Sequence, residues 1–247
     1  MADRILVPVE LPDPEPLSQT LIDDLASLQI VLLGHFNVPE QTPTGVAAEQ
    51  FRESAQETLD DIAQRFTAAG ASVETRLEFG KARTATISRV AAEEDCDAEL
   101  DPEPTDSIES ILVPIPDVAE FSRLPTFVRL LTEDSTTDVT LFHVVEDDES
   151  HEQGQQIVDD TREGMIAEGF DPELLDTKVV EGTEHDNEIL RVAADYDAVV
   201  MYEAESRLGD RLFGTLPDRI ANETGDPVIV VKRDYEPRLR DDDSAEN

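Results

Sequence analysis

The residues best suited to binding chemistry lie between two hydrophobic runs near the end of the chain. Ala198–Tyr202 and Val228–Val231 are both expected to form buried strands, and Gly214-Thr215 stands between them, directly before a stretch expected to form a helix. Where a strand leads through a loop into a helix in an α/β fold, the first amides of the helix can hold phosphate groups. This segment is therefore a candidate phosphate-binding loop.

A simpler interpretation of the same residues is structural. Thr215-Leu216-Pro217-Asp218 matches a capping box with proline in the first helical turn, so an ordinary helix start also explains Gly214-Thr215. We favour this structural interpretation over a phosphate site. Both interpretations predict a helix that begins just after Thr215.

The remaining reactive side chains give little sign of catalysis. His35 and His143 recur at what look like equivalent strand ends, and we expect both to be packed or hydrogen-bonded, because no companion ligands are spaced for a metal. Cys96 is the single cysteine, which excludes an internal disulfide, and it is expected to be an inert thiol. No Ser/His/Asp, Cys/His or paired-carboxylate set stands out. The sequence therefore predicts a protein that is not an enzyme.

The charge balance indicates where such a chain could work. The chain has 247 residues, with 58 Asp and Glu against 19 Lys and Arg and a net charge of −39. That charge would self-repel in dilute buffer, whereas at 1 M salt the Debye length is only about 3 Å. An acidic, lysine-poor chain with regular apolar periodicity therefore predicts the cytosol of a halophile. The same charge disfavours binding to nucleic acid. No apolar run approaches the length of a membrane span and no signal peptide is recognisable, so we expect a soluble, cytoplasmic protein that is not embedded in a membrane.

An internal repeat organises the elements that carry these residues. The run Ile-Leu-Val-Pro occurs twice, and three later segments match in the same order. The matching pairs are 5–8 and 111–114, 75–80 and 177–182, 87–92 and 189–194, and 97–98 and 197–198. Strands that alternate with helices predict parallel sheets with right-handed crossovers. The expected fold class is therefore α/β, with two tandem doubly wound parallel-sheet domains.

The two copies differ in length, which sets the expected domain boundaries. We expect a first domain over residues 1–104, truncated after its third helix, and a complete second domain over residues 105–235. The join between them, Asp101–Asp106, has the composition of a linker. Residues 236–247 are expected to be an acidic, disordered tail.

Taken together, these segments resemble the universal stress protein family in its tandem form. The resemblance rests on Ile-Leu-Val-Pro opening each copy, Leu-Phe-His-Val-Val at 141–145, Ile-Leu-Arg-Val-Ala-Ala-Asp-Tyr-Asp-Ala-Val-Val-Met at 189–201, and the closing Pro-Val-Ile-Val-Val. It implies a Rossmann-like fold in each copy. Nucleotide-binding members of this family carry Gly-x2-Gly-x9-Gly-(Ser/Thr) after the Val-Val-Met strand. Here Tyr202 and Glu205 replace the first two glycines, eight residues separate Glu205 from Gly214, and only Gly214-Thr215 remains.

The resemblance also implies where a nucleotide would lie. Carried over onto this chain, the family's site would comprise Asp117, Val145, Met201, Gly214 and Thr215. Because a bulky ring and a carboxylate would obstruct and repel a triphosphate, we expect a degenerate site and no bound cofactor, and a stress-response protein that acts through protein association. Family members often form dimers along the final strand, which predicts a homodimer through Val228–Val231. The alternative is an ATP- or AMP-binding regulatory module, or a cytoplasmic regulator of a membrane transporter.

Overall fold

The computed structural model describes residues 3–103, 108–115, 124–132, 136–145, 150–203 and 215–232. Within these ranges the chain forms two compact units, one from residues 3–16 and 25–100 and the other from residues 17–24 and 101–232. The predicted Asp117 and Gly214, and the predicted tail over residues 236–247, lie outside the described residues.

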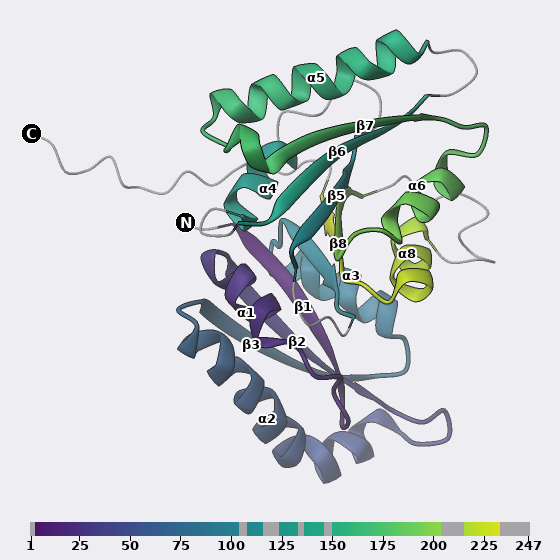
Figure 1. Ribbon diagram of the computed structural model, residues 1–247. Helices are drawn as coiled ribbons and strands as arrows, with labels where there is room; N and C mark the ends of the chain where they lie inside the picture. The colour runs from purple at the N-terminus through teal and green to yellow at the C-terminus, as the bar shows by residue number, and fades with distance from the viewer. Residues whose placement is uncertain are drawn as a thin grey trace, which may run out of the picture. The chain divides into compact units, whose positions relative to one another are not determined.

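The first unit is a parallel sheet with strand order β3-β2-β1-β4. Figure 1 labels β1, β2 and β3 and the helices α2 and α3. Helix α2 packs on β2 and β3, and helix α3 packs on β1, β2 and β3. A short strand, β4, follows α3 within the expected first domain. Its elements are β1 (Arg4–Leu11), η1 (Leu25–Ser27), β2 (Gln29–Asn37), α2 (Thr44–Ala68), β3 (Ser72–Gly80), α3 (Arg83–Glu93) and β4 (Ala98–Asp101).

The second unit is a parallel sheet with strand order β9-β8-β5-β6-β7. Helix α5 packs on β6 and β7, whereas α6 and α8 pack against one another. Its elements are α1 (Gln19–Asp24), β5 (Ser110–Pro114), α4 (Leu124–Leu131), β6 (Asp138–Val145), α5 (His151–Ala167), η2 (Pro172–Leu174), β7 (Leu175–Glu181), α6 (His185–Ala193), β8 (Ala198–Tyr202), α8 (Leu216–Thr224) and β9 (Val228–Val231).

The central strands are buried on both faces, as their continuous apolar runs require. In β1, Ile5, Leu6 and Val7 are fully inaccessible, and every residue of β8 is buried. Alternate residues of each strand then face different helices. In the second unit, for example, Phe142 and Val144 join an apolar cluster with Ile189 of α6 and Ile220 of α8. The predicted α/β class with parallel pairing of strands is confirmed.

In each unit, an aspartate that directly precedes a later strand accepts a hydrogen bond from the start of the central strand, β1 or β5. In the first unit the Arg4 amide donates to Asp97 Oδ2 at 2.8 Å. In the second unit the Ser110 amide donates to Asp197 Oδ2, also at 2.8 Å, and the Ser110 hydroxyl donates to the same oxygen at 2.9 Å. In both units this contact fixes the register between the two strands on either side of the point where the strand order reverses.

The expected equivalence of His35 and His143 is wrong by one residue. Ile5 pairs with Ile30 in the first unit, and the equivalent Ile111 pairs with Val139 in the second. Counted from these pairs, His143 lies four residues along its strand, which is the position of Gly34 rather than of His35. Because successive strand residues point to opposite faces, the two imidazoles lie on different sides of their sheets. His143 is packed as expected, and its Nδ1–H donates to the Ile115 carbonyl oxygen at 2.7 Å. For His35, neither ring nitrogen has a hydrogen-bond partner.

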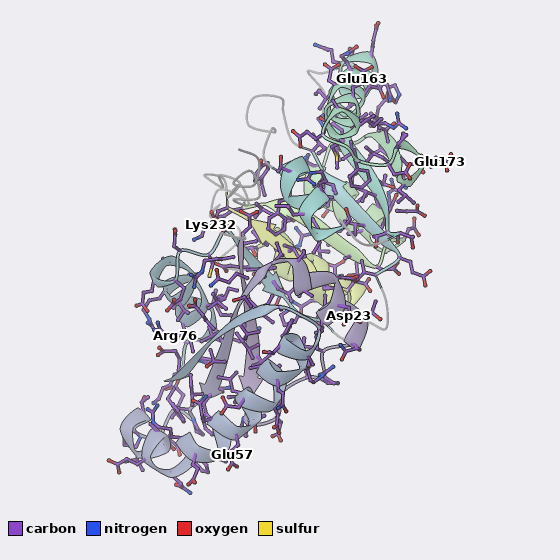
Figure 2. The ribbon with its side chains drawn as sticks, turned by 90° about the vertical axis from the view of Figure 1, so that its left-hand side faces the viewer. Asp23, Glu57, Arg76, Glu163, Glu173 and Lys232 are labelled. Atoms are coloured by element: carbon purple, nitrogen blue, oxygen red, sulfur yellow. The ribbon has the colours of Figure 1, made fainter. Side chains whose placement is uncertain are left out.

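Acidic side chains cover the helices on their outer faces. Glu57 on α2, Glu163 on α5 and Glu173 in η2 are exposed and project away from the ribbon (Figure 2). Among the described residues, no helix is long and apolar enough to cross a membrane.

Candidate functional site

The candidate site lies at the carboxyl edge of the second unit's sheet. Strands β6 and β7 lie on one side of β5, whereas β8 and β9 lie on the other, so the strand order reverses between β5 and β8. Ligands of open α/β sheets bind in the crevice at such a switch point, flanked by the helices that follow its two strands. Here those helices are α4, which follows β5, and α8, which follows β8.

Tyr202, the last residue of β8, is directed to the first of these helices. Its phenol oxygen accepts the backbone N–H of Leu124, the first residue of α4, at 2.8 Å. The side chain is only 8% exposed, so the ring is buried as well as bonded. The next residue, Glu203, still donates its N–H to Val231 O of β9 at 2.8 Å. The backbone thus keeps its sheet hydrogen bonding as far as Glu203. The buried Tyr202 ring lies at the end of β8, at the crevice.

The N-terminus of α8 is likewise hydrogen-bonded to an oxygen atom from the same chain, the Oδ2 atom of Asp218. Thr215 is the N-cap residue, and its backbone N–H and hydroxyl donate to Asp218 Oδ2 at 2.9 and 2.7 Å. In return the Asp218 N–H donates to Thr215 Oγ1 at 3.4 Å. The capping box expected from the sequence is therefore present. The Asp218 carboxylate places a negative charge at the end of the helix dipole that would otherwise favour a phosphate.

The other described residues of the predicted site lie on different faces of the sheet. Val145, at the end of β6, faces α5, since its Cγ2 atom lies beside Gly154. Met201, on β8, instead joins the apolar cluster with α6 and α8. Both are almost fully buried, at 5% and 6% exposure. Thr215 lies at the N-terminus of α8, where the sequence places it.

One feature of this site could not be found in the sequence. The bond between Tyr202 and Leu124 joins residues 78 positions apart, and no spacing of residue types indicates a phenol at a helix start. The only indication in the sequence is Tyr202 itself, a bulky residue where the motif described above has glycine. Among the described residues, no group of three or more His, Cys, Asp or Glu side chains could hold a metal ion.

Known proteins resemble this chain in structure rather than in sequence. No protein-family model and no curated protein sequence matches the chain. A universal stress protein from Archaeoglobus fulgidus aligns with a TM-score of 0.66 at 17% identity, covering 94% of this chain and 96% of that one. A protein of unknown function from Pseudomonas aeruginosa aligns with a TM-score of 0.54 at 17% identity, covering 94% and 92%.

A third solved structure comes from a transport protein. The cytoplasmic domain of a prokaryotic cation chloride cotransporter aligns with a TM-score of 0.55 at 11% identity, covering 96% of this chain and 98% of that domain. At such identities the likeness concerns the fold alone. The chain has the fold of universal stress proteins along nearly its whole length.

Proposed function

We propose that the protein is a non-enzymatic, universal-stress-protein-like protein that acts by binding other proteins, and that its nucleotide site is degenerate. One observation carries the proposal. The helix N-termini on both sides of the switch point, those of α4 and α8, are bonded to oxygen atoms of the chain itself, from Tyr202 and Asp218. A nucleotide would have to replace both.

The physical cost of that replacement is substantial. Moving the Tyr202 ring would leave the buried Leu124 amide without its acceptor, which costs about 1–3 kcal/mol unless the ligand supplies one. Releasing Asp218 would break the capping box, worth about 1 kcal/mol, and its carboxylate would repel a triphosphate. These costs come before any gain from the ligand.

A calorimetric titration of Mg·ATP into the full chain at about 2 M KCl, where surface charge is screened, tests the proposal. We expect no heat of binding and no thermal shift. Gly214→Arg is the matched control, because it places a bulky side chain next to Thr215 in the sequence and leaves Tyr202 and Asp218 themselves unchanged. Micromolar ATP binding that Gly214→Arg abolishes would contradict the proposal, since Tyr202 would then have to move aside.

The alternative function is an ATP- or AMP-binding regulatory module that controls a membrane transporter. The structural likeness to the cytoplasmic domain of a cation chloride cotransporter, over nearly all of both chains, favours this partner class. Affinity purification of the tagged chain from membranes solubilised in molar KCl tests it. Recovery of a transporter supports the alternative, whereas an eluate without any membrane protein argues against it.

We further propose a cytoplasmic protein of a halophile that forms a homodimer through β9. The excess of 58 acidic over 19 basic residues supports the first part. For the second, β9 carries the partly exposed Val230 between buried neighbours.

A further inference from the structure

We propose that the junction between β3 and α3 in the first unit binds a phosphate-type oxyanion. The junction is Gly80-Lys81-Ala82-Arg83, and the imidazole of His35 on β2 faces it. This site is separate from the crevice of the second unit, and it does not depend on whether that crevice binds a nucleotide. The ligand class is a phosphate group, either free or as the monoester of a small molecule.

His35 is the first observation. The residue is 1% exposed, and neither Nδ1 nor Nε2 has a hydrogen-bond partner. Leaving a buried polar group unpaired costs about 1–3 kcal/mol. A ligand that bonds to the imidazole would remove this penalty. The ring is aimed at the junction, because Nε2 lies 3.4 Å from where a Cβ atom of Gly80 would stand. Thr86 Oγ1, in the first turn of α3, lies at the same 3.4 Å from that point.

The N-terminus of α3 is the second observation. Its N-cap residue is Ala82, whose side chain cannot accept a hydrogen bond, and the first turn contains no acidic residue. Helical bonding begins with the Thr86 N–H, which donates to Ala82 O at 3.0 Å, so the amides of Thr84 and Ala85 have no acceptor within the helix. An 11-residue helix that starts in this way presents amides and the positive end of its dipole to an anion.

The corresponding junction in the second unit differs in each of these respects. Gly182 pairs in sequence with Gly80, but Glu184 is the N-cap of α6, and Asp186 and Glu188 lie in its first turn. Val144 occupies the place of His35 and packs in the apolar cluster. Of these two junctions, only the one in the first unit combines a buried imidazole with a helix start that lacks an acidic residue.

Lys81 and Arg83 supply the positive charge. They flank the N-cap of α3 in a chain with only 19 basic residues, and the Lys81 ammonium already binds the Glu40 carbonyl oxygen, which fixes it beside the junction. The charged groups that face His35 are Glu10 from β1, Glu78 from β3 and Arg83 from α3. Glu78 forms ion pairs with Arg76 and Arg89 at 3.5 and 3.0 Å, and Glu10 accepts from the Asn37 amide at 3.3 Å.

These contacts assign a role to each group. The amides of α3 bind one phosphate oxygen, the neutral imidazole donates one N–H to another, and Lys81 and Arg83 balance the charge. Burial lowers the pKa of His35 below its usual 6.5, which favours the neutral ring in the protein alone. A bound dianion beside the ring must raise that pKa, which gives a readout separate from affinity.

The test follows the imidazole resonances of His35 by NMR in the full chain, with increasing inorganic phosphate in one series and glycerol 3-phosphate in the other, in buffered molar KCl. We expect saturable shifts and a rise in the His35 pKa. Lys81→Gln is expected to weaken binding about tenfold, the loss typical of a charge-assisted hydrogen bond. Lys178→Gln, which removes a lysine that lies over the Tyr196 ring of the second unit, is the control and leaves the affinity unchanged.

Saturable binding of either compound supports the proposal, and the tighter one identifies the source of the phosphate group. Equal weakening in Lys81→Gln and Lys178→Gln would overturn it, because phosphate would then respond to net charge alone. An unchanged His35 pKa at saturating phosphate would overturn it too. Gly80→Ala gives a second variant that keeps every charge, and it is expected to weaken binding by inserting a methyl group between the ring and the helix.

Discussion

Tyr202 joins two elements of the second unit that are far apart in the sequence. Its phenol oxygen accepts the backbone N–H of Leu124, at the start of a helix 78 residues earlier in the chain. The residue therefore contributes to the stability of the second unit, and in the proposed function it also occupies the space that a nucleotide would need.

The stability contribution can be measured with Tyr202→Phe, which keeps the ring and removes the hydroxyl. The Leu124 amide loses its acceptor in a buried setting, so the free energy of unfolding is expected to fall by about 1–3 kcal/mol. Denaturant unfolding in molar KCl measures the change. Tyr196→Phe, at a half-buried tyrosine of the same unit, is the control and is expected to stay within about 0.5 kcal/mol of wild type. Equal losses in the two variants would contradict this account of the hydroxyl.

The ionised carboxylate of Asp24, the last residue of α1, destabilises the folded state. Burial, and after it the neighbouring charge of Asp23, raises the pKa of this carboxyl from 3.8 to about 6, and Oδ2 has no hydrogen-bond partner. The folded state therefore binds a proton more tightly than the unfolded state does. The resulting penalty is absent below pH 3.8, grows as the pH rises, and is complete above about 6.

Asp24→Asn is accordingly expected to stabilise the protein at pH 7.5 by about 1 kcal/mol, after allowance for solvent screening of a partly exposed group. The gain should vanish near pH 4, where the wild-type carboxyl is neutral in the folded state. Thermal unfolding at the two pH values measures both. A gain of the same size at both would show that the amide, rather than the loss of charge, is responsible.

At the scale of elements, helix α5 approaches β6 closely because Gly154 has no side chain. A Cβ atom at Gly154 would lie 2.5 Å from Val145 Cγ2 and 3.0 Å from His143 Cδ2. A second glycine of the same helix, Gly164, has nothing within 4 Å of its Cβ position. The two glycines therefore test packing and helix propensity separately.

Gly154→Ala is expected to lower the free energy of unfolding by about 1–3 kcal/mol through overpacking. Gly164→Ala is expected to raise it by about 0.5–1 kcal/mol, since alanine is the better helix former and meets no obstacle. Chemical denaturation of both variants measures the difference. Stabilisation by Gly154→Ala would show that α5 can shift outward from the sheet at little cost.

At the scale of the whole molecule, charge is the dominant property. With a net charge of −39, the folded chain is expected to gain stability as salt screens its self-repulsion. We expect the melting temperature to rise by about 10 °C or more between 0.2 and 3 M KCl. NaCl at equal ionic strength is the control and should act similarly. A flat or falling melting temperature would contradict adaptation to a salt-rich cytosol.

The oligomeric state is measured by light scattering coupled to size-exclusion chromatography at about 2 M KCl. The predicted homodimer requires twice the mass of one chain. Val230→Glu, at the partly exposed position of β9, is expected to shift the equilibrium to monomer while circular dichroism stays unchanged. Monomeric wild-type protein would contradict dimerisation through β9.

Strands and helices were largely predictable from the sequence, because continuous apolar runs and helical spacing specify them locally. The capping box at Thr215 was predictable for the same reason, since it lies within four consecutive residues. Contacts that depend on register were not. His35 and His143 each stand near the end of an expected strand, which suggested that they are equivalent, but the strand pairing shifts them by one residue and onto opposite faces. The Tyr202 bond and the unpaired His35 ring depend on the folded arrangement.

The aspartates that fasten the first strands also constrain the order of events during synthesis. The hydrogen-bond partner of Arg4, Asp97, is synthesised 93 residues later, and that of Ser110, Asp197, is synthesised 87 residues later. Each central strand therefore gains its second neighbour only after most of its unit has left the ribosome. Such distant pairing slows folding, because long loops must close before the contacts form. During that interval β1 and then β5 each lack one neighbouring strand, and we expect nascent chains to rely on chaperones or on charge repulsion to remain unaggregated.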